Sequence, residues 1–239
     1  MKLSKRLETI VSQAAKAAAG GRAADVGCDH GFVPITLVET GAVSRAIAMD
    51  VRKGPLMRAK AHIAAHGLSD VIETRLSDGL EKLNPGEADT VIIAGMGGEL
   101  MLRILKDGAH VREHIRHWIL SPQSELGVFR HGLEELGLAV TDEVMVEEDG
   151  KYYVIMTVEP GQMHWEEEFR YRYGDRLITG RSPELYRLLC RERQQYAEIA
   201  RQLEGASGEG AKARLNEIKK ELKQIEEALY AMQGVDRTV

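Results

Sequence analysis

Hydrophobic positions in the first 159 residues alternate between short apolar runs and stretches with helical spacing. The runs, each typical of a buried strand, cover residues 23–27, 45–50, 71–75, 90–94 and 118–121. Apolar residues recur with a helical period over residues 3–18, 32–40, 53–66, 97–107 and 125–136. Strands that alternate with helices of this length predict a parallel sheet covered by helices on both faces.

The alternation changes beyond residue 137, where two extended runs follow each other without a helix between them. They are joined at Asp149-Gly150 in the stretch LAVTDEVMVEEDGKYYVIMTVEP, which ends at Pro160. A dipeptide of this kind between two strand-like runs is a strong hairpin signal. Residues 1–159 are therefore predicted to form an α/β domain whose sheet ends in an antiparallel hairpin.

Residues 160–239 are predicted to form a separate helical domain with an antiparallel coiled-coil hairpin. One seam steps by three or four residues through Leu215, Ile218, Leu222, Ile225, Leu229 and Met232. Its partner seam consists of Leu185, Leu189, Tyr196, Ile199 and Leu203. Charged Glu192 stands where this second seam lacks an apolar residue, and residues 205–210 form a turn between the two seams. The seams pair within one chain or between two, so we expect a monomer or a weak dimer.

Composition places the chain among ordinary soluble globular proteins, with 44% apolar and 29% charged residues. Its formal net charge of −5 requires any nucleic-acid contact to depend on a local basic patch. The two cysteines, Cys28 and Cys190, are far apart, which argues against a disulfide framework or a zinc ribbon. No stretch approaches the roughly 20 apolar residues needed to span a bilayer. We expect a cytoplasmic protein without a membrane partner.

Histidine pairs four residues apart raise the question of a metal site. They are His62 with His66 and His110 with His114, but neither lies in an H-E-x-x-H pattern and no cysteine is near. No metal is therefore expected. The chain also lacks the phosphate-binding G-x-x-x-x-G-K-[ST] loop and the G-x-S-x-G nucleophile turn.

The turn after the first strand reads AADVGCDHGFVPI over residues 23–35. A dinucleotide-binding turn needs G-x-G-x-x-G, whereas here Gly27 is followed by Cys28 and Asp29. Because a carboxylate at this point repels a phosphate, an NAD-dependent dehydrogenase is the weakest interpretation. S-adenosylmethionine suits the turn better, since it carries a sulfonium and an α-ammonium group and no phosphate.

Acids occur near the ends of three successive predicted strands, at Asp25, Asp50 and Asp78. In open α/β sheets, ligands bind beyond the carboxyl ends of the strands. Asp50 is placed to accept hydrogen bonds from both ribose hydroxyls, and Asp78 from the adenine amino group. Each acid taken alone is more typical of a helix N-cap or a turn than of a binding site. Together they favour a cofactor pocket.

The fourth strand ends in AGMGG (94–98), where Gly95 brings bare backbone close to the methyl donor and Met96 is free to pack against a base. The Asn/Asp-Pro-Pro-aromatic stretch of many enzymes that methylate exocyclic amines is absent. A ring nitrogen such as adenine N1 needs no such stretch, because it already carries a lone pair. Asp29 is the best-placed carboxylate to stabilise the cationic product or to take a proton from the adjacent amine. His30 either orients Asp29 or the base, or simply packs at a helix start.

Five motifs resemble the bacterial tRNA (adenine-N1)-methyltransferases that modify nucleotide 22 in the D-arm. They are LSKRL (3–7), ADVGCDH (24–30), SDGL (77–80), IAGMGG (93–98) and EEDGKYY (147–153). The resemblance implies a Rossmann-like class I methyltransferase fold, S-adenosylmethionine as methyl donor and tRNA as acceptor. It also implies that the C-terminal helical domain helps to hold the tRNA.

The resemblance also assigns roles to individual residues. Cofactor binding is expected at Arg6, Asp25, Gly27, Cys28, Asp50, Asp78, Gly79, Ala94, Gly95 and Met96. Asp29 and His30 match the catalytic acid–histidine pair, and Lys5 precedes Arg6 in a basic motif that faces the cofactor carboxylate or an RNA phosphate. Ser121-Pro122-Gln123 departs from the Gln-Pro-Asn of some members, although Gln123 can still hydrogen-bond a base edge.

An arginine-rich segment interleaved with tyrosines begins the C-terminal domain, which is a pattern suited to phosphate contacts and base stacking. We expect RNA contacts from Arg170, Arg172, Arg187 and Arg191. A solvated charged helix face is the other interpretation of this segment. Two other functions remain open, namely methylation of another RNA or a small molecule, and a noncatalytic RNA-binding scaffold that has kept the fold.

Overall fold

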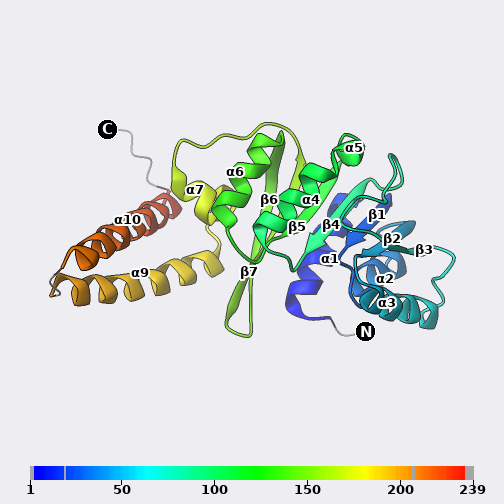
Figure 1. Cartoon of the computed structure of the whole chain (residues 1–239), viewed down its shortest axis with the longest axis horizontal. Helices are drawn as coiled ribbons and strands as arrows, with labels where there is room; N and C mark the ends of the chain where they lie inside the picture. The colour runs from blue at the N-terminus through cyan, green and yellow to red at the C-terminus, as the bar shows by residue number, and fades with distance from the viewer. Residues whose placement is uncertain (1–2, 19, 206–207, 235–239) are drawn as a thin grey trace. The chain divides into compact units, whose positions relative to one another are not determined.

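The computed structural model describes residues 3–18, 20–205 and 208–234. Within them the chain forms two compact units that divide between His164 and Trp165, shortly after the boundary expected at residue 159 (Figure 1). The two units are called the N-terminal and the C-terminal unit below. Ala206 and Ser207, in the predicted turn at 205–210, lie outside the described residues.

A seven-stranded sheet with the order β3-β2-β1-β4-β5-β7-β6 runs through the described part of the N-terminal unit (Figure 1). Its strands are β1 (Arg22–Val26), β2 (Arg45–Asp50), β3 (Ile72–Leu76), β4 (Thr90–Ala94), β5 (His117–Ser121), β6 (Leu138–Glu148) and β7 (Lys151–Pro160). The first five strands pair in parallel, and β7 is antiparallel to both β5 and β6. The predicted α/β sheet with a terminal antiparallel hairpin is confirmed.

Helices cover both faces of this sheet. They are α1 (Lys5–Ala18), α2 (Phe32–Glu39), α3 (Lys53–Ala65), α4 (Gly98–Asp107), α5 (Ala109–Arg112) and α6 (Leu126–Glu135). One core cluster joins Ile10 of α1 and Ile35 of α2 to Ile92, Ile119 and Ile155 of the strands. Helices α4 and α6 pack against each other, and α6 packs against β6. The short α5 was not predicted because four residues are too few for a helical period.

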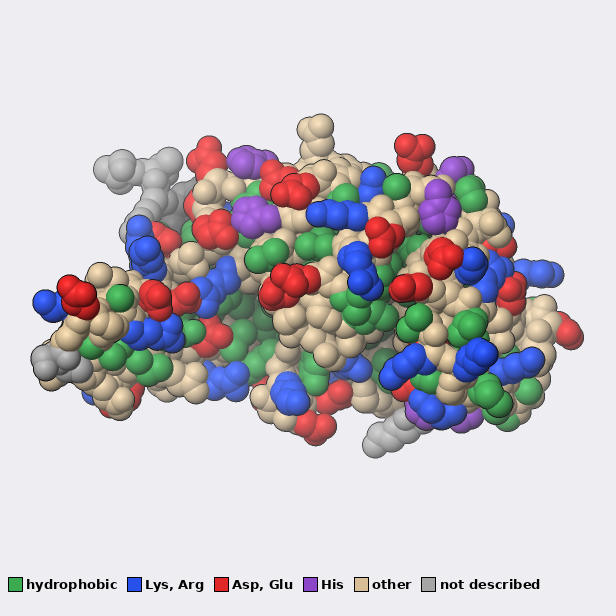
Figure 2. Space-filling view, viewed as in Figure 1, with side chains coloured by type: hydrophobic (Ala, Val, Ile, Leu, Met, Phe, Trp, Pro, Cys, Tyr) green, Lys and Arg blue, Asp and Glu red, His purple; other side chains and the backbone are tan. Residues whose placement is uncertain are grey.

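Charge is unevenly distributed over the N-terminal unit. Lys and Arg side chains gather over α3, at the lower right of Figure 2. Helix α3 carries no acidic residue in its first turn.

The terminal hairpin anchors α1. Asp149 and Gly150 form its turn with φ angles of 50° and 74°, the left-handed pair that a two-residue hairpin turn requires. Behind the turn, the Arg6 amide donates a hydrogen bond to Glu148 Oε1 at 3.2 Å, and Gln13 Nε2 donates to Asp142 Oδ2 at 3.0 Å. These bonds fix the start of α1 beside the sheet.

The C-terminal unit consists of α7 (Glu168–Tyr173), α8 (Asp175–Thr179), α9 (Pro183–Glu204) and α10 (Glu209–Met232). The two long helices form a hairpin (Figure 1), and their mutual face buries Leu185, Leu189, Ile218, Ile225, Leu229 and Met232. The predicted pair of long helices is confirmed, and in this structure they pack within one chain. Ser182 caps α9, because its hydroxyl accepts a hydrogen bond from Leu185 N at 3.3 Å.

Glu192, the charged residue in the second seam, has polar neighbours on α7. The Tyr173 hydroxyl donates a hydrogen bond to Glu192 Oε2 at 3.3 Å, and burial raises the pKa of Glu192. Nearby, Arg172 forms an ion pair with Glu221 and donates to Gln224 Oε1 at 3.1 Å. The break in the seam is therefore where α7 docks onto the helical hairpin.

A fully buried ion pair links α6 to β6. Arg130 donates to Glu143 Oε1 through Nε at 2.9 Å and through Nη2 at 2.6 Å, and both side chains are 0% exposed. Sequence patterns did not indicate this contact, because neither residue interrupts a visible apolar period.

Removing one member of this pair is expected to destabilise the fold. Arg130→Met leaves Glu143 charged without its guanidinium, and we expect a loss of about 3–5 kcal/mol in the free energy of unfolding. The double variant Arg130→Met/Glu143→Leu should recover most of that loss, since no buried charge remains. Urea unfolding of the three proteins measures both effects. A double variant no more stable than the single one would contradict this account.

Candidate active site

A cavity of about 570 Å³ opens beyond the carboxyl ends of β1, β2 and β4. β1 lies between β2 and β4, so the chain reverses its direction of winding at this place, where ligands bind in open α/β sheets. The sequence-predicted residues that line the cavity are Arg6, Gly27, Asp29, Asp50, Asp78, Gly79, Ala94, Gly95, Met96 and Gln123. The fold thus brings together residues from six separate segments. Lys5, Asp25, Cys28 and His30 are not among the lining residues.

Two buried carboxylates stand on neighbouring strands beside this cavity. Asp25 on β1 is 6% exposed and Asp50 at the end of β2 is 5% exposed. Burial, followed by the charge of Asp50, raises the pKa of Asp25 to about 7. Asp50 accepts a hydrogen bond from Arg52 N at 2.8 Å and faces the cavity directly. Asp25 therefore does not line the cavity, and it can influence a bound ligand only through its charge.

Bare backbone forms the cavity floor between these acids. Gly27 has a φ of +78°, which favours glycine, and the Gly27 and Cys28 amides donate to Met49 O at 2.8 and 3.0 Å. A Cβ on Gly27 would lie 2.4 Å from the Met96 Cε atom. Any side chain at residue 27 would consequently have to displace the Met96 methyl group and fill the floor.

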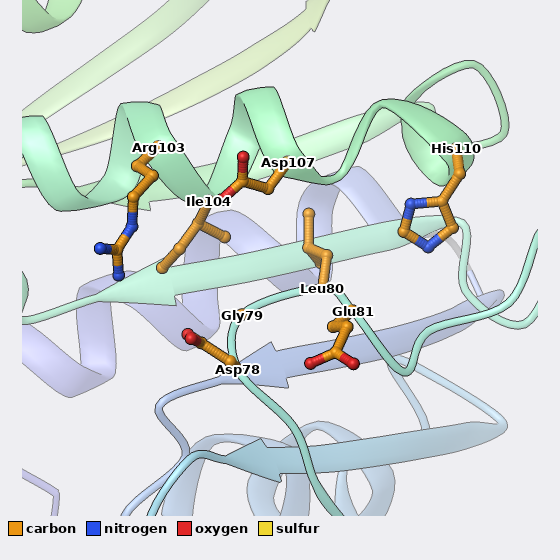
Figure 3. Close-up of a pocket in the computed structure, with 8 residues that line it drawn as sticks. All are labelled: Asp78, Gly79, Leu80, Glu81, Arg103, Ile104, Asp107 and His110. Carbon is orange, nitrogen blue, oxygen red and sulfur yellow. The ribbon is translucent and has the colours of Figure 1, made fainter.

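The loop after β3 forms one wall. Ser77 holds it, since its amide donates to Asp50 O and its hydroxyl to Gly79 O, each at 3.0 Å. Asp78 is exposed and lines both this cavity and a neighbouring one of about 400 Å³. Figure 3 shows Asp78 and Glu81 on this loop opposite Arg103 of α4. The wall therefore offers hydrogen-bond acceptors, with a guanidinium facing them.

Asp29 is held at the mouth of the cavity by α3. Its backbone has a φ of +21°, and its half-exposed carboxylate accepts a hydrogen bond through Oδ1 from Arg58 Nη2 at 2.7 Å. The other oxygen, Oδ2, lies 3.7 Å from His30 Nε2. Arg58 therefore fixes one carboxylate oxygen and leaves the second toward the histidine.

His30 belongs to a stack of three rings. Its ring centroid lies 5.2 Å from that of Phe32 and 5.4 Å from that of His62. His62 Nδ1 is 2.9 Å from the His30 carbonyl oxygen, so Nδ1 carries the proton and donates it. Arg58 and His62 are one helical turn apart, and together they clamp the loop that carries both candidate catalytic residues.

Arg6 reaches the cavity from α1. Its guanidinium lies 5.0 Å above the ring centroid of Tyr153, a cation–π contact. A Cβ built on Gly95 would lie 3.8 Å from Arg6 Nη1 and 3.9 Å from Gln123 Nε2. Arg6 and Gln123 therefore converge on the glycine turn after β4, where the sequence placed the methyl donor.

Sequence patterns did not indicate seven of the lining residues, namely Val26, Val51, Arg52, Ser77, Leu100, Arg103 and Ile104. Adjacency to Asp50 was a usable signal for Val51 and Arg52. No sequence pattern pointed to Arg103, or to the supporting role of Arg58, because α4 and α3 reach the cavity only through tertiary packing.

The arginines expected to bind RNA differ in their surroundings. Arg170 pairs with Asp175 and with Glu167, and Arg172 pairs with Glu221, so both hold the C-terminal unit together. Arg187 is about half exposed and pairs with Glu184 at 3.1 Å, whereas Arg191 is exposed. All four RNA contacts stay predictions, and the exposed pair has the better access to a phosphate.

Three of the four paired histidines have partners for their side chains in the structure. His62 contacts the His30 carbonyl, His66 Nδ1 lies 2.6 Å from Glu39 Oε1, and His110 Nε2 lies 3.0 Å from Leu83 O. Across the described ranges, no group of three metal-ligating side chains is placed to hold an ion. None of the helices that the structure describes has both the length and the apolar character to cross a membrane.

The raised pKa of Asp25 predicts a pH-dependent stability. The unfolded chain ionises Asp25 near pH 4 and the folded chain only near pH 7, so stability is lost as the pH rises through that window. Asp25→Asn cannot ionise, and its stability relative to the unsubstituted protein should rise by roughly 3–4 kcal/mol between about pH 4 and pH 8. Urea unfolding without added ligands measures this difference. A constant difference across the range would refute it.

Comparison with known proteins gives consistent matches. Residues 3–156 match the family described as "Methyltransferase domain". The tRNA (adenine(22)-N(1))-methyltransferase of Bacillus subtilis (strain 168) is 38% identical over 161 residues, which cover 67% of this chain and 66% of that protein. The match thus spans just under two thirds of that relative.

Solved structures extend the likeness over nearly the whole chain. The crystal structure of the B. subtilis m1A22 tRNA methyltransferase has 31% sequence identity and a TM-score of 0.83, covering 95% of this chain and 99% of that one. A Streptococcus pneumoniae protein solved with S-adenosyl-L-methionine has 33% identity and a TM-score of 0.81, covering 95% and 100%. The chain belongs to the methyltransferase-domain family, and its resemblance to the bacterial tRNA (adenine-N1)-methyltransferases is confirmed.

Proposed function

We propose that this chain transfers a methyl group from S-adenosylmethionine to N1 of adenine 22 in the D-arm of tRNA. The observation that carries the proposal is the cavity at the strand ends, with acids around it and bare backbone as its floor. The solved S-adenosyl-L-methionine complex and the B. subtilis enzyme support the donor and the acceptor.

The polar groups around the cavity fit S-adenosylmethionine. Asp50 has a buried carboxylate facing the cavity, suited to the ribose hydroxyls, and Asp78 suits the adenine amino group. Arg6 is the lining cation nearest the Gly95 turn and suits the amino-acid carboxylate. Asp25, beneath the floor, favours positive charge above it. When bound, S-adenosylmethionine supplies an electrophilic methyl group.

Asp29 provides the carboxylate for the acceptor. Adenine must leave its base stack for N1 to reach the cavity, which places the ring near the mouth where Asp29 lies. Methylation makes the ring cationic, and a carboxylate fixed beside it lowers the energy of that charge in the transition state. Arg58 holds Asp29 Oδ1, so Oδ2 is left to approach the adenine amino group. The stacked His30 ring bounds this space.

Acceptor binding involves both units. Gln123 lines the cavity and is placed to contact a base edge, whereas Lys5 lies outside it and suits a phosphate. In the C-terminal domain, assigned to residues 160–239, Arg187 and Arg191 are the better-exposed candidates for phosphate contacts. A tRNA acceptor also implies a cytoplasmic location. Pairing of α9 with α10 within one chain favours a monomer.

A methylation assay with defined transcripts tests the function. Purified protein, S-adenosylmethionine and an unmodified tRNA containing A22 should yield 1-methyladenosine by nucleoside mass spectrometry, and an A22→G transcript should yield none. Product from both transcripts would indicate another RNA position. Binding of S-adenosylmethionine by calorimetry without product would indicate another acceptor, and absence of binding would indicate a noncatalytic scaffold.

Variants of Asp29 and Arg58 test the mechanism. Asp29→Ala should bind S-adenosylmethionine normally and lose at least about 100-fold in kcat. Arg58→Met should lower kcat at saturating tRNA, because the carboxylate loses its fixed orientation, and Arg58→Lys should recover part of it. Steady-state kinetics and calorimetry provide these values. Normal turnover by Asp29→Ala would remove both residues from the mechanism.

A further inference from the structure

The segment from Arg52 to His66 is the most one-sided stretch of positive charge in the N-terminal unit. It reads RKGPLMRAKAHIAAH and contains four Lys or Arg, two His and no Asp or Glu, in a chain whose formal net charge is −5. It comprises the N-cap, the whole of α3 and the C-cap. The Lys and Arg side chains that gather over α3 are visible in Figure 2.

Helix α3 has three faces with different environments. Ala59 and Ile63 are buried in the core, and Arg58 and His62 hold the Asp29–His30 loop. The third face carries Lys53, Met57 and Lys60, which follow one another at helical spacing and are all exposed. This third face, together with Arg52, is called the α3 basic surface.

Helix stability does not explain these charges. Arg52 and Lys53 stand at the N-terminal end of α3, where the helix dipole disfavours cations. Arg52 has a side chain that is 75% exposed and lies 3.9 Å from its acidic neighbour Asp50. Among the described residues, Lys53 and Lys60 form no ion pair within 4.0 Å. The two lysine charges are thus available to an external partner.

The exposed apolar residue on this face also indicates a binding surface. Met57 is 72% exposed between the two lysines, and it is the most exposed of the large hydrophobic residues described. Exposed methionines are common on surfaces that bind varied partners, because the side chain adapts its shape. A basic stripe with an apolar centre suits a sugar–phosphate backbone, whose phosphates are anionic and whose riboses have apolar faces.

The surface is continuous with the candidate active site. Arg52 lines the cavity, and Arg58, on the adjoining face of the same helix, touches Asp29 at its mouth. Lys53 and Lys60 are separated by about 10 Å along the helix axis, enough to meet different phosphates. A nucleotide placed in the cavity would therefore bring its flanking backbone toward α3.

We propose that the α3 basic surface binds the tRNA backbone that flanks the methylated adenine. The inference rests on the proposed function and adds a docking surface to the N-terminal unit. Contacts to phosphates carry no sequence information, so this surface positions the acceptor and leaves the choice of base to the cavity. Such contacts also make binding dependent on salt, because each one releases condensed counterions.

Charge reversal at the two lysines tests the proposal. Lys53→Glu/Lys60→Glu should weaken binding of unmodified tRNA at least about tenfold and lower the slope of log affinity against log salt by about 1.5. The dissociation constant for S-adenosylmethionine and kcat at saturating tRNA should stay unchanged, because neither lysine lines the cavity. Fluorescence titration with labelled tRNA at several salt concentrations, calorimetry and steady-state kinetics provide these values.

A matched control separates local contacts from net charge. Lys16→Glu/Lys106→Glu makes the same charge change at exposed lysines of α1 and α4 and should leave the salt slope intact. Lys53→Gln/Lys60→Gln, which removes charge without adding acids, should give the same loss of slope with a smaller loss of affinity. An equal loss of tRNA affinity in the Lys16→Glu/Lys106→Glu control would overturn the proposal. So would unchanged tRNA binding by Lys53→Glu/Lys60→Glu, provided that thermal unfolding shows this variant to be folded. If tRNA binds through α3 but adenine is not methylated, the proposed function fails alone.

Discussion

Two carboxylates buried side by side at the end of a parallel sheet are the constraint on which this site depends. Asp25 and Asp50 are nearly inaccessible, and burial, followed by the charge of Asp50, raises the pKa of Asp25 to about 7. The same environment raises the pKa of the Cys28 thiol, through burial first and then through the charges of both acids. Cys28 is therefore not a nucleophile at neutral pH, because nucleophilicity requires the thiolate. In the proposed complex, a cationic ligand above Gly27 would offset the repulsion between these acids.

A single helix connects several requirements of the site. Helix α3 packs on β2 and β3 through its apolar face, clamps the Asp29–His30 loop through Arg58 and His62, and presents the α3 basic surface to solvent. Each of these tasks uses a different side of the same helix, so none compromises another. The positive charge that fixes Asp29 and the charge assigned to the RNA backbone are thereby held at a constant distance by regular helical geometry.

The C-terminal unit shows why charge counted along a sequence is a poor guide to a binding surface. Arg170 and Arg172 lie in a segment rich in arginine, but their guanidinium groups pair with acids at the N-cap of α7, on α8 and on α10. One of those acids, Glu221, lies 49 positions from Arg172 in the sequence, so its pairing is not visible in the arginine-rich segment. In α3 the situation is reversed, because the helix that carries the exposed lysines contains no Asp or Glu to pair with them.

The sequence alone determined the order of strands and helices, the terminal hairpin and the pair of long C-terminal helices. The spacing of apolar residues encodes each of these locally. The gathering of the acids in one place could also be predicted, because parallel strands end at the same edge of the sheet. Tertiary structure alone decided which side chains from distant segments meet, both at that edge and in the core. Arg58 reaches Asp29 from 29 positions away, Arg103 enters from α4, and Arg130 finds Glu143 inside the core. Such contacts depend on how helices pack on the sheet, and no local spacing in the chain records that packing.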